Sequence, residues 1–225
     1  YSRTANPYFY PYDAEHNYQY DYDILPGDEP DLKRGFNIFE ERENTDNETI
    51  ISSFNSIFDT ELRFNDQWKL SSQVGIQWDQ SSQEQYVGEN TFNMRNIRED
   101  SSYDENQYIV PKGGMHTVNN ATTSQITWKV QGEYKNTFND IHDIQIMAGS
   151  EIRKNWYNTQ FTAGYGYDPK TLTTKPLNIR NDKDAEKYKL HTKTYQENAF
   201  ASFYTTGSYS FMSRYTIGGS VRMDG

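Results

Sequence analysis

Residues 54–78, FNSIFDTELRFNDQWKLSSQVGIQW, contain two alternating runs that meet at Asn65-Asp66. In both runs the even positions are mostly apolar, and the odd positions are mostly polar or charged. The apolar positions are Phe54, Phe58, Leu62, Phe64, Trp68, Leu70, Val74, Ile76 and Trp78. A period of two is typical of a strand with one apolar face. We therefore predict a hairpin with a tight turn at Asn65-Asp66.

Aromatic residues stand ten positions apart on the apolar face of three predicted strands. The pairs are Phe54 with Phe64, Trp68 with Trp78, and Trp128 with Phe138. Ten residues at roughly 3.3 Å each, tilted by about 40°, rise on the order of 25 Å. The apolar band of an outer-membrane barrel has this height and carries aromatic rings at both edges. Core aromatics of a water-soluble β-sandwich remain the alternative explanation.

The composition is polar for a folded chain. The 225 residues carry a formal net charge of -10, a mean hydropathy of -1.01 and no cysteine, yet 16% of them are aromatic. A transmembrane barrel reconciles these values, because half of each strand faces water and the loops are polar. No stretch approaches the roughly 18 apolar residues of a membrane helix. No basic stripe appears either, so we expect no nucleic-acid partner.

Short turns and long loops alternate along the predicted chain. We expect strands over about 48–64, 66–80 and 122–137, one through Ile144 to Arg153, and a last hairpin over 197–224. The three turns centre near residues 65, 139 and 213. The long loops cover about 81–120 and 157–194. Tight periplasmic turns and long extracellular loops are typical of bacterial barrels, and this pattern fits six consecutive strands.

The phase of the strands assigns each side chain to a face. For the first strand of the last hairpin it is ambiguous, because Phe200 and Tyr204 oppose Phe203, Tyr209 and Phe211. The residues expected to face lipid are Leu70, Val74, Ile76, Ile126, Trp128 and Val130. The residues expected to face the lumen include Lys69, Gln73, Lys129, Gln131, Glu133, Glu151 and Arg153. These polar groups either satisfy one another or seat a plug.

The first 44 residues are rich in tyrosine, aspartate and proline, and we expect them to be mostly loop. The acidic residues there are Asp21, Asp23, Asp28, Glu29 and Asp31. Carboxylates can hold a hard cation, but the glycine and glutamate spacing of an EF-hand loop is missing. We therefore expect no metal site, and a solvated acidic loop is the preferred interpretation.

Three groups of motifs stand out along the chain. They are Asn6-Pro7 with Pro11-Tyr12-Asp13, Phe36-Asn37-Ile38 with Glu40-Glu41-Arg42, and Glu197-Asn198 with Tyr215-Thr216-Ile217, Gly219-Ser220-Val221-Arg222 and Asp224-Gly225. Together they resemble the SusC/RagA family of TonB-dependent outer-membrane transporters of the Bacteroidetes. The resemblance implies an all-β, antiparallel transmembrane barrel in the cell outer membrane, of which residues 1–225 form part. It implies nutrient uptake powered by the TonB complex through a plug, and a SusD-like surface lipoprotein as partner. The plug, the TonB box and the C-terminal strand are not among these residues.

The function expected is import of an oligosaccharide or a peptide. Trp156, Tyr157, Tyr165 and Tyr167 are the candidate substrate-binding residues, because loop aromatics can stack on sugars or contact peptides. Packing between loops or docking of the lipoprotein explains them equally well. We expect no catalytic residues and no cofactor, since no nucleophile, phosphate-binding or metal motif is present. The alternatives are a secreted β-sandwich carbohydrate-binding module and a glycoside hydrolase with two carboxylates.

Overall fold

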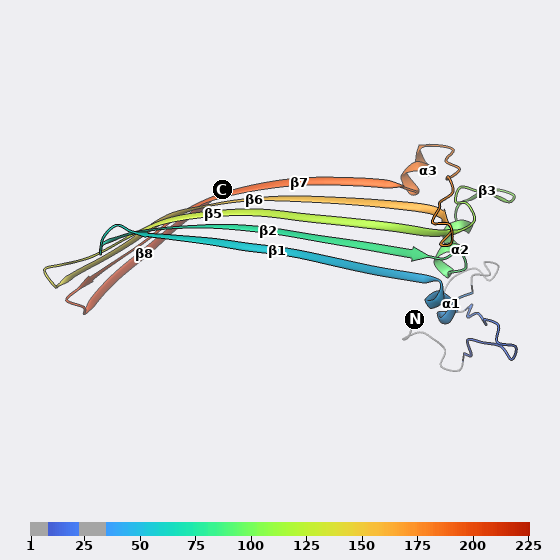
Figure 1. Ribbon diagram of the computed structural model, residues 1–225, viewed down its shortest axis with the longest axis horizontal. Helices are drawn as coiled ribbons and strands as arrows, with labels where there is room; N and C mark the ends of the chain where they lie inside the picture. Colours follow the sequence, from blue (N-terminus) through green and yellow to red (C-terminus); the bar gives the residue numbers. More distant parts are fainter. Residues whose placement is uncertain (1–8, 23–34) are drawn as a thin grey trace. The chain divides into compact units, whose positions relative to one another are not determined.

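The computed structural model describes residues 9–22 and 35–225, and it is dominated by long antiparallel strands. The long strands are β1 (Thr45–Arg63), β2 (Trp68–Val87), β5 (Gly114–Phe138), β6 (His142–Tyr167), β7 (His191–Phe211) and β8 (Tyr215–Asp224). They form one six-stranded sheet in the order β1-β2-β5-β6-β7-β8 (Figure 1). Because every neighbour follows in sequence, the sheet is a meander, with β1 and β8 at its edges.

The short elements lie in the two long connections and before β1. They are α1 (Ile38–Glu43), α2 (Phe92–Glu99), a small hairpin of β3 (Ser102–Asp104) and β4 (Gln107–Tyr108), and α3 (Asp182–Lys187). Within the described residues, no helix is long and apolar enough to cross a membrane. The all-β expectation is confirmed.

The three predicted turns are confirmed, and local chemistry explains each of them. The side-chain oxygen of Asn65 accepts hydrogen bonds from the backbone N–H groups of Gln67 and Trp68, at 2.9 and 2.8 Å. This contact closes the β1–β2 turn as an Asx turn does. Asn139 and Asp140 both have positive φ, of 51° and 56°, which asparagine and aspartate tolerate better than most residues. The β7–β8 turn also uses positive φ, at Met212 and Ser213.

The strands are longer than the alternation predicts. β2 continues to Val87 and β5 begins at Gly114, so the loop predicted over 81–120 was wrong at both ends. β6 runs to Tyr167 and β7 begins at His191, which likewise shortens the loop predicted over 157–194. In the extension of β2, residues 80–85 are polar on both faces, so the periodic signal disappears there while backbone pairing continues.

The chain divides into two compact units, and the long strands contribute residues to both. The first unit holds the described residues of Tyr1–Ile50, Ser82–Asn120 and Gln160–Lys193. It has a small apolar core of Val87, Met94, Ile109, Val110 and Tyr188. Ile97, Tyr103, Met115, Tyr165 and Leu177 pack around this core. The two long connections are therefore folded segments that pack together.

Residues 9–22 belong to the first unit, and hydrogen bonds from the Asn37 side chain hold them next to α1. This side chain has no solvent exposure. Its oxygen caps α1 by accepting from the N–H groups of Phe39 and Glu40, and its amide donates to the carbonyls of Pro11 and Gln19 at 2.6 and 2.7 Å. One buried amide thus satisfies four backbone groups.

The second unit comprises Ile51–Ser81, Ala121–Thr159 and Thr194–Gly225. Its β7–β8 pairing resolves the ambiguous phase of β7. Phe203 pairs with Met223, and Tyr209 with Ile217, which places Phe203 and Tyr209 on the apolar face. Tyr204 instead pairs with Arg222 on the polar face. Each strand here has one apolar and one polar face.

The apolar face of the second unit is exposed. Large apolar side chains on it include Phe58, Trp68, Ile126, Trp128, Ile146, Ile152, Phe203, Ile217 and Val221, with exposed fractions from 41% to 72%. A β-sandwich buries the inner faces of its sheets against each other, in strands of about 5–6 residues. Here the sheet strands run from 10 to 26 residues and no second sheet covers this face within the described residues. The sandwich alternative is therefore not favoured.

Candidate functional site

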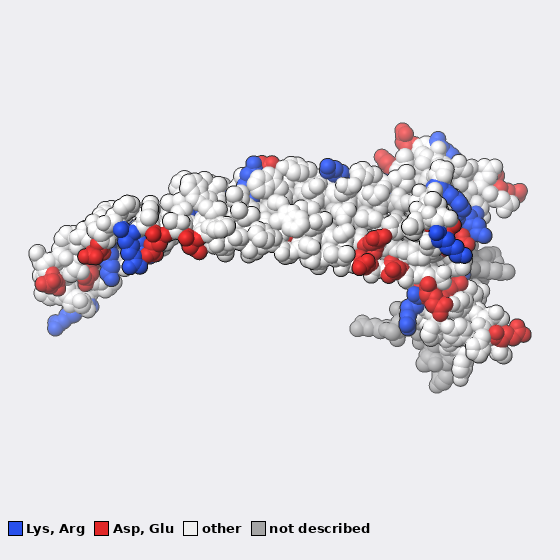
Figure 2. Space-filling view, viewed as in Figure 1, with Lys and Arg blue, Asp and Glu red and all other residues white. Residues whose placement is uncertain are grey.

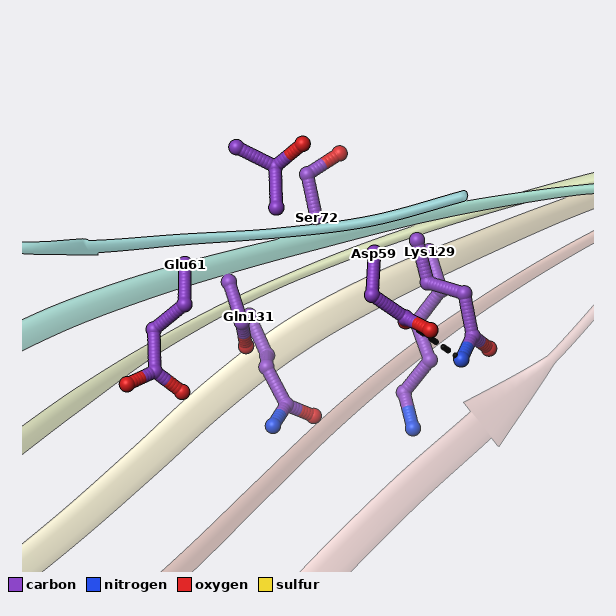
Figure 3. Close-up of a pocket in the computed structure, with 8 residues that line it drawn as sticks. Asp59, Glu61, Ser72, Lys129 and Gln131 are labelled. Carbon is purple, nitrogen blue, oxygen red and sulfur yellow. Dashed lines mark hydrogen bonds between the residues drawn. The ribbon is translucent and has the colours of Figure 1, made fainter. Parts of the chain in front are cut away.

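The polar face of the second unit holds a hollow of about 320 Å³ on β1, β2 and β5. Figure 3 shows Asp59, Glu61, Lys129 and Gln131 reaching into the polar side of the sheet, while Ser72 lies on the opposite side. The side chains alternate because neighbouring residues of a strand point to opposite faces. The amide of Gln73 donates to a carboxylate oxygen of Asp59 at 2.7 Å, joining β2 to β1 across this face.

Charged side chains of this face pair across strands. The Lys69 ammonium lies 3.2 Å from Glu61 on β1 and 3.6 Å from Glu133 on β5, so a single cation links three strands. Arg63 adds a second contact to Glu61, at 2.8 Å. All these side chains retain partial solvent exposure, which makes the pairs individually weak. Together they keep the face polar with its charges balanced.

The polar network continues across β5, β6 and β7. The Tyr204 hydroxyl donates to the side-chain oxygen of Gln131 at 3.1 Å, and the Lys129 ammonium lies 5.7 Å from the centre of the Tyr204 ring. Glu151 and Arg153 pair at 2.7 Å on β6. A second hollow of about 390 Å³ is lined by Glu151, Arg153, Phe200, Ser202, Arg222 and Asp224. The lumen-facing residues predicted from the alternation thus share one polar face.

The four predicted substrate-binding aromatics do not lie in a loop, so that part of the prediction was wrong. Trp156, Tyr157, Tyr165 and Tyr167 all belong to β6. In the second unit, Trp156 lies under the ammonium of Lys154, 5.2 Å from the ring centre, and Tyr157 is 41% exposed. Trp156 and Tyr157 are consecutive strand residues and therefore point to opposite faces.

Tyr165 and Tyr167 belong to the first unit and have different partners. Tyr165 packs against the apolar core, with its ring edge-to-face against Tyr188 at 6.1 Å. Burial raises the pKa of its hydroxyl. Tyr167 stacks on His116 at 4.8 Å. Gly166, with a φ of +63°, lies between the two tyrosines and interrupts the strand alternation. Tyr165 therefore supports the fold and is a poor candidate for touching substrate.

Tyr167 belongs to a polar and aromatic cluster in the first unit. His116 contacts Glu84 at 2.6 Å, and the Tyr86 ring lies 5.7 Å from Tyr167. A hollow of about 270 Å³ beside them is also lined by Asp46, Glu48, Pro169 and Leu172. Of the four predicted residues, Tyr157 is exposed and Tyr167 lines this hollow, so these two stay as candidates for ligand contact. No local pattern predicts the contact between His116 and Tyr167, because they are 51 positions apart in the sequence.

Two helices of the long connections were missed, although their capping residues were visible. The Thr91 hydroxyl accepts from the N–H of Met94 at the start of α2, and the Asn181 side chain accepts from Asp184 at the start of α3. Arg180 holds Asp184 with three hydrogen bonds, from its backbone and its side chain, and lowers the pKa of this carboxyl. Figure 2 shows charged side chains gathered around these helices. Threonine or asparagine before a helical turn is the signal that was available.

Within the described residues, no three His, Asp or Glu side chains lie close enough together to hold a metal ion. Of the predicted acidic loop, only Asp21 is described, and it pairs with Phe36 in an isolated β-bridge. Asp23, Asp28, Glu29 and Asp31 lie outside the described residues, as does the Asn6-Pro7 motif.

Comparison with known proteins bears on the fold. No family model matches this chain, and no curated protein does. The structure of the RagAB peptide importer in its open-open state matches at a TM-score of 0.67 and 16% identity, covering 95% of this chain and 21% of that one. The chain shares the fold of part of that structure.

Two further structures agree with this likeness. The RagAB peptide importer in its closed-closed state and the RagAB peptide transporter match at TM-scores of 0.61 and 0.62, both at 16% identity. Each covers 81% of this chain, which spans 18% of theirs. The chain thus spans about a fifth of the length of the structures that it resembles. The fold expected from the SusC/RagA motifs is supported at this level.

Proposed function

We propose that this chain forms part of the wall of an outer-membrane β-barrel that imports a nutrient. The observation that carries the proposal is the division of the second unit into two faces. One face exposes apolar side chains such as Ile146 and Phe203, at 46% and 56%, whereas the other holds the network around Lys69 and Gln131. In water such an apolar face is unfavourable, but in a bilayer it is the expected surface of a barrel, with the polar face lining the lumen.

The antiparallel meander fits this role. Barrels close by continuing such a meander until its edges pair, because lipid offers no partner for the backbone groups of a free strand edge. Here the two edges are β1 and β8. The likeness to part of the RagAB structures supports a large transporter barrel as the complete assembly. We propose outer-membrane lipid as the contact of the apolar face.

The remaining features follow from the SusC-type resemblance. We propose that import is energised by TonB through a plug, and that a SusD-like surface lipoprotein binds the extracellular end. The substrate is an oligosaccharide or a peptide, and this segment carries out no bond chemistry. Tyr157 and Tyr167 are the aromatic residues through which it would contact ligand. Their stacking contributes about 0.5–1.5 kcal/mol each beyond area burial, so useful affinity needs several contacts.

Fractionation and growth experiments test this function together. The complete gene product should sediment with the outer membrane, resist extraction by alkaline buffer and dissolve in detergent. Cells that lack the gene should lose growth on either oligosaccharides or peptides as sole nutrient, and regain it on complementation. The nutrient on which growth requires the gene identifies the substrate class. A protein that is released by buffer, or that hydrolyses the nutrient when purified, contradicts the proposal.

A further inference from the structure

Two glycines of the first unit meet where the chain enters β5 and where it leaves β6. Gly113 is the last residue before β5 and has a φ of +139°, and Gly166 is the penultimate residue of β6 and has a φ of +63°. A Cβ on Gly113 would lie 2.7, 2.8 and 2.9 Å from the C, Cα and O atoms of Gly166. Main-chain atoms cannot swing aside as the tip of a side chain can, so this close approach requires glycine.

Both long connections of the first unit pack against this glycine contact. A Cβ on Gly166 would lie 2.8 Å from Pro111 Cγ in the β2–β5 connection and 2.8 Å from Lys175 Cβ in the β6–β7 connection. The backbone N–H of Lys175 donates to the Tyr165 carbonyl at 3.0 Å, and its ammonium donates to the Lys112 carbonyl at 2.8 Å. Lys175 therefore joins its own connection to β6 and to the β2–β5 connection.

Further contacts join the two connections away from the glycines. The Asn178 N–H donates to the Ile109 carbonyl at 2.9 Å, which is a backbone hydrogen bond from one connection to the other. The Arg180 guanidinium lies 4.1 Å from the centre of the Tyr103 ring. The apolar core of the first unit also takes buried residues from both connections. Separating the connections would break these contacts together and expose that core, so their opening is expected to be cooperative.

We propose that the two long connections move as one body, locked at the contact between Gly113 and Gly166, and that neither connection acts as a separate lid. The proposal rests on the function proposed above, in which both connections stand at the extracellular end of a barrel. Entry of a nutrient then moves the two connections together, or leaves both in place while other parts of the transporter open. A lid made of one connection alone would have to break the shared core and the shared hydrogen bonds in every cycle.

Hydrogen exchange of the complete gene product tests this coupling. The Ile109 N–H donates to the Ser101 carbonyl at 2.9 Å within the β2–β5 connection, and the Tyr188 N–H donates to the Asp184 carbonyl at 3.0 Å within the β6–β7 connection. Each amide therefore reports the opening of its own connection. Gly113→Ala places a Cβ against main-chain atoms at a positive φ, and we expect both amides to exchange roughly tenfold faster or more.

The matched control is the same substitution at a glycine with open space around it. A Cβ on Gly132 of β5 would meet no atom within 4 Å, so Gly132→Ala should leave the exchange of both amides unchanged. Faster exchange of one connection alone in Gly113→Ala, or no change in either, overturns the proposal. An equal change in Gly132→Ala overturns the role of the glycine contact.

A cross-link between the connections decides the question if Gly113→Ala does not fold. The 225 residues contain no cysteine, and the Lys175 side chain reaches the Lys112 carbonyl, so cysteines at these two positions can be joined by a short thiol-reactive reagent. The cross-linked protein should support uptake as well as each singly labelled variant does. Failure to cross-link, or loss of uptake on cross-linking, overturns the proposal. An unmodified protein that transports nothing contradicts the proposed function instead, and hydrogen exchange then still decides the coupling.

Discussion

An arginine introduced on the apolar face of β5, which we propose contacts lipid, should destabilise the protein far more than one introduced at the next residue. On β6, Ala148 lies midway between His142 and Lys154, the polar residues at the two ends of the apolar stretch. The carbonyl of Val130 lies beside Gly149, within about one residue of that midpoint. Val130 is therefore close to the middle of the proposed membrane, and its side chain shares the face of Trp128. Val130→Arg is the substitution that tests this placement.

The expected loss of folding stability depends on how deep the substituted residue lies in the bilayer. Arginine on the lipid face of a barrel costs about 2–4 kcal/mol at the midplane and falls towards zero at the interfaces. For Val130→Arg we expect about 2–3 kcal/mol, which is a roughly 30- to 140-fold change in the folding equilibrium. Gln131→Arg should cost about 1 kcal/mol or less, the value of its hydrogen bond with Tyr204. Glu133, 3.5 Å from the Gln131 amide, offers the new cation a partner.

The assay is reversible urea unfolding of the complete gene product refolded into lipid vesicles, with both variants compared in the same lipid. The difference between the two variants is the quantity of interest, because it cancels effects of adding an arginine to β5. Equal costs at Val130 and Gln131, or a larger cost at Gln131, would refute the assignment of faces.

Three further predictions concern the ends of the strands. Cysteines placed at Ser102 and Thr173 should react with an impermeant maleimide on intact cells, whereas one at Ser213 should not; the reverse pattern would invert the topology. Tyr165→Ala should destabilise the core of the first unit by about 2–4 kcal/mol, seen as faster proteolysis of both long connections, while Tyr165→Phe should not; equal rates would remove Tyr165 from the core. Arg180 lowers the pKa of Asp184, so this carboxylate stabilises α3 above about pH 4, and the contribution is lost as pH falls through the lowered pKa. We expect the amide protection of α3, corrected for intrinsic exchange, to decrease in the unmodified protein as pH falls through this pKa. In the Asp184→Asn variant the decrease should be much smaller. An equal decrease in both proteins would contradict the role of Asp184.

The sequence predicts the sheet well where one face is apolar. The hairpin at Asn65 and the alternation through Trp78 carry a strong signal, because mostly apolar and mostly polar positions alternate there. Beyond Trp78 the residues at 80–85 are polar on both faces, and the signal ends although β2 continues to Val87. In β7 the phase was ambiguous until pairing with β8 assigned Phe203 and Tyr204 to opposite faces.

The candidate site could be predicted only in part, for a related reason. The polar face was expected from the positions of Lys69 and Gln131, since periodicity alone assigns them. The sequence analysis placed the aromatic residues of β6 in a loop. It could not predict the contacts of Tyr165, because the core that Tyr165 touches is assembled from distant segments, including Met94 and Tyr188. The contact between Lys154 and Glu197 depends on the register between β6 and β7, which no local pattern reveals.

The central claim is that one face of this sheet contacts lipid and the other water. The most direct measurement attaches a nitroxide label at each position from 124 to 133 of β5, in the complete gene product reconstituted in lipid. Collision with molecular oxygen reports lipid contact, and collision with a polar nickel chelate reports water. The account predicts a period of two, with oxygen highest at Ile126, Trp128 and Val130 and nickel highest at Lys129 and Gln131. Profiles that rise and fall together, or that lack the alternation, would contradict it.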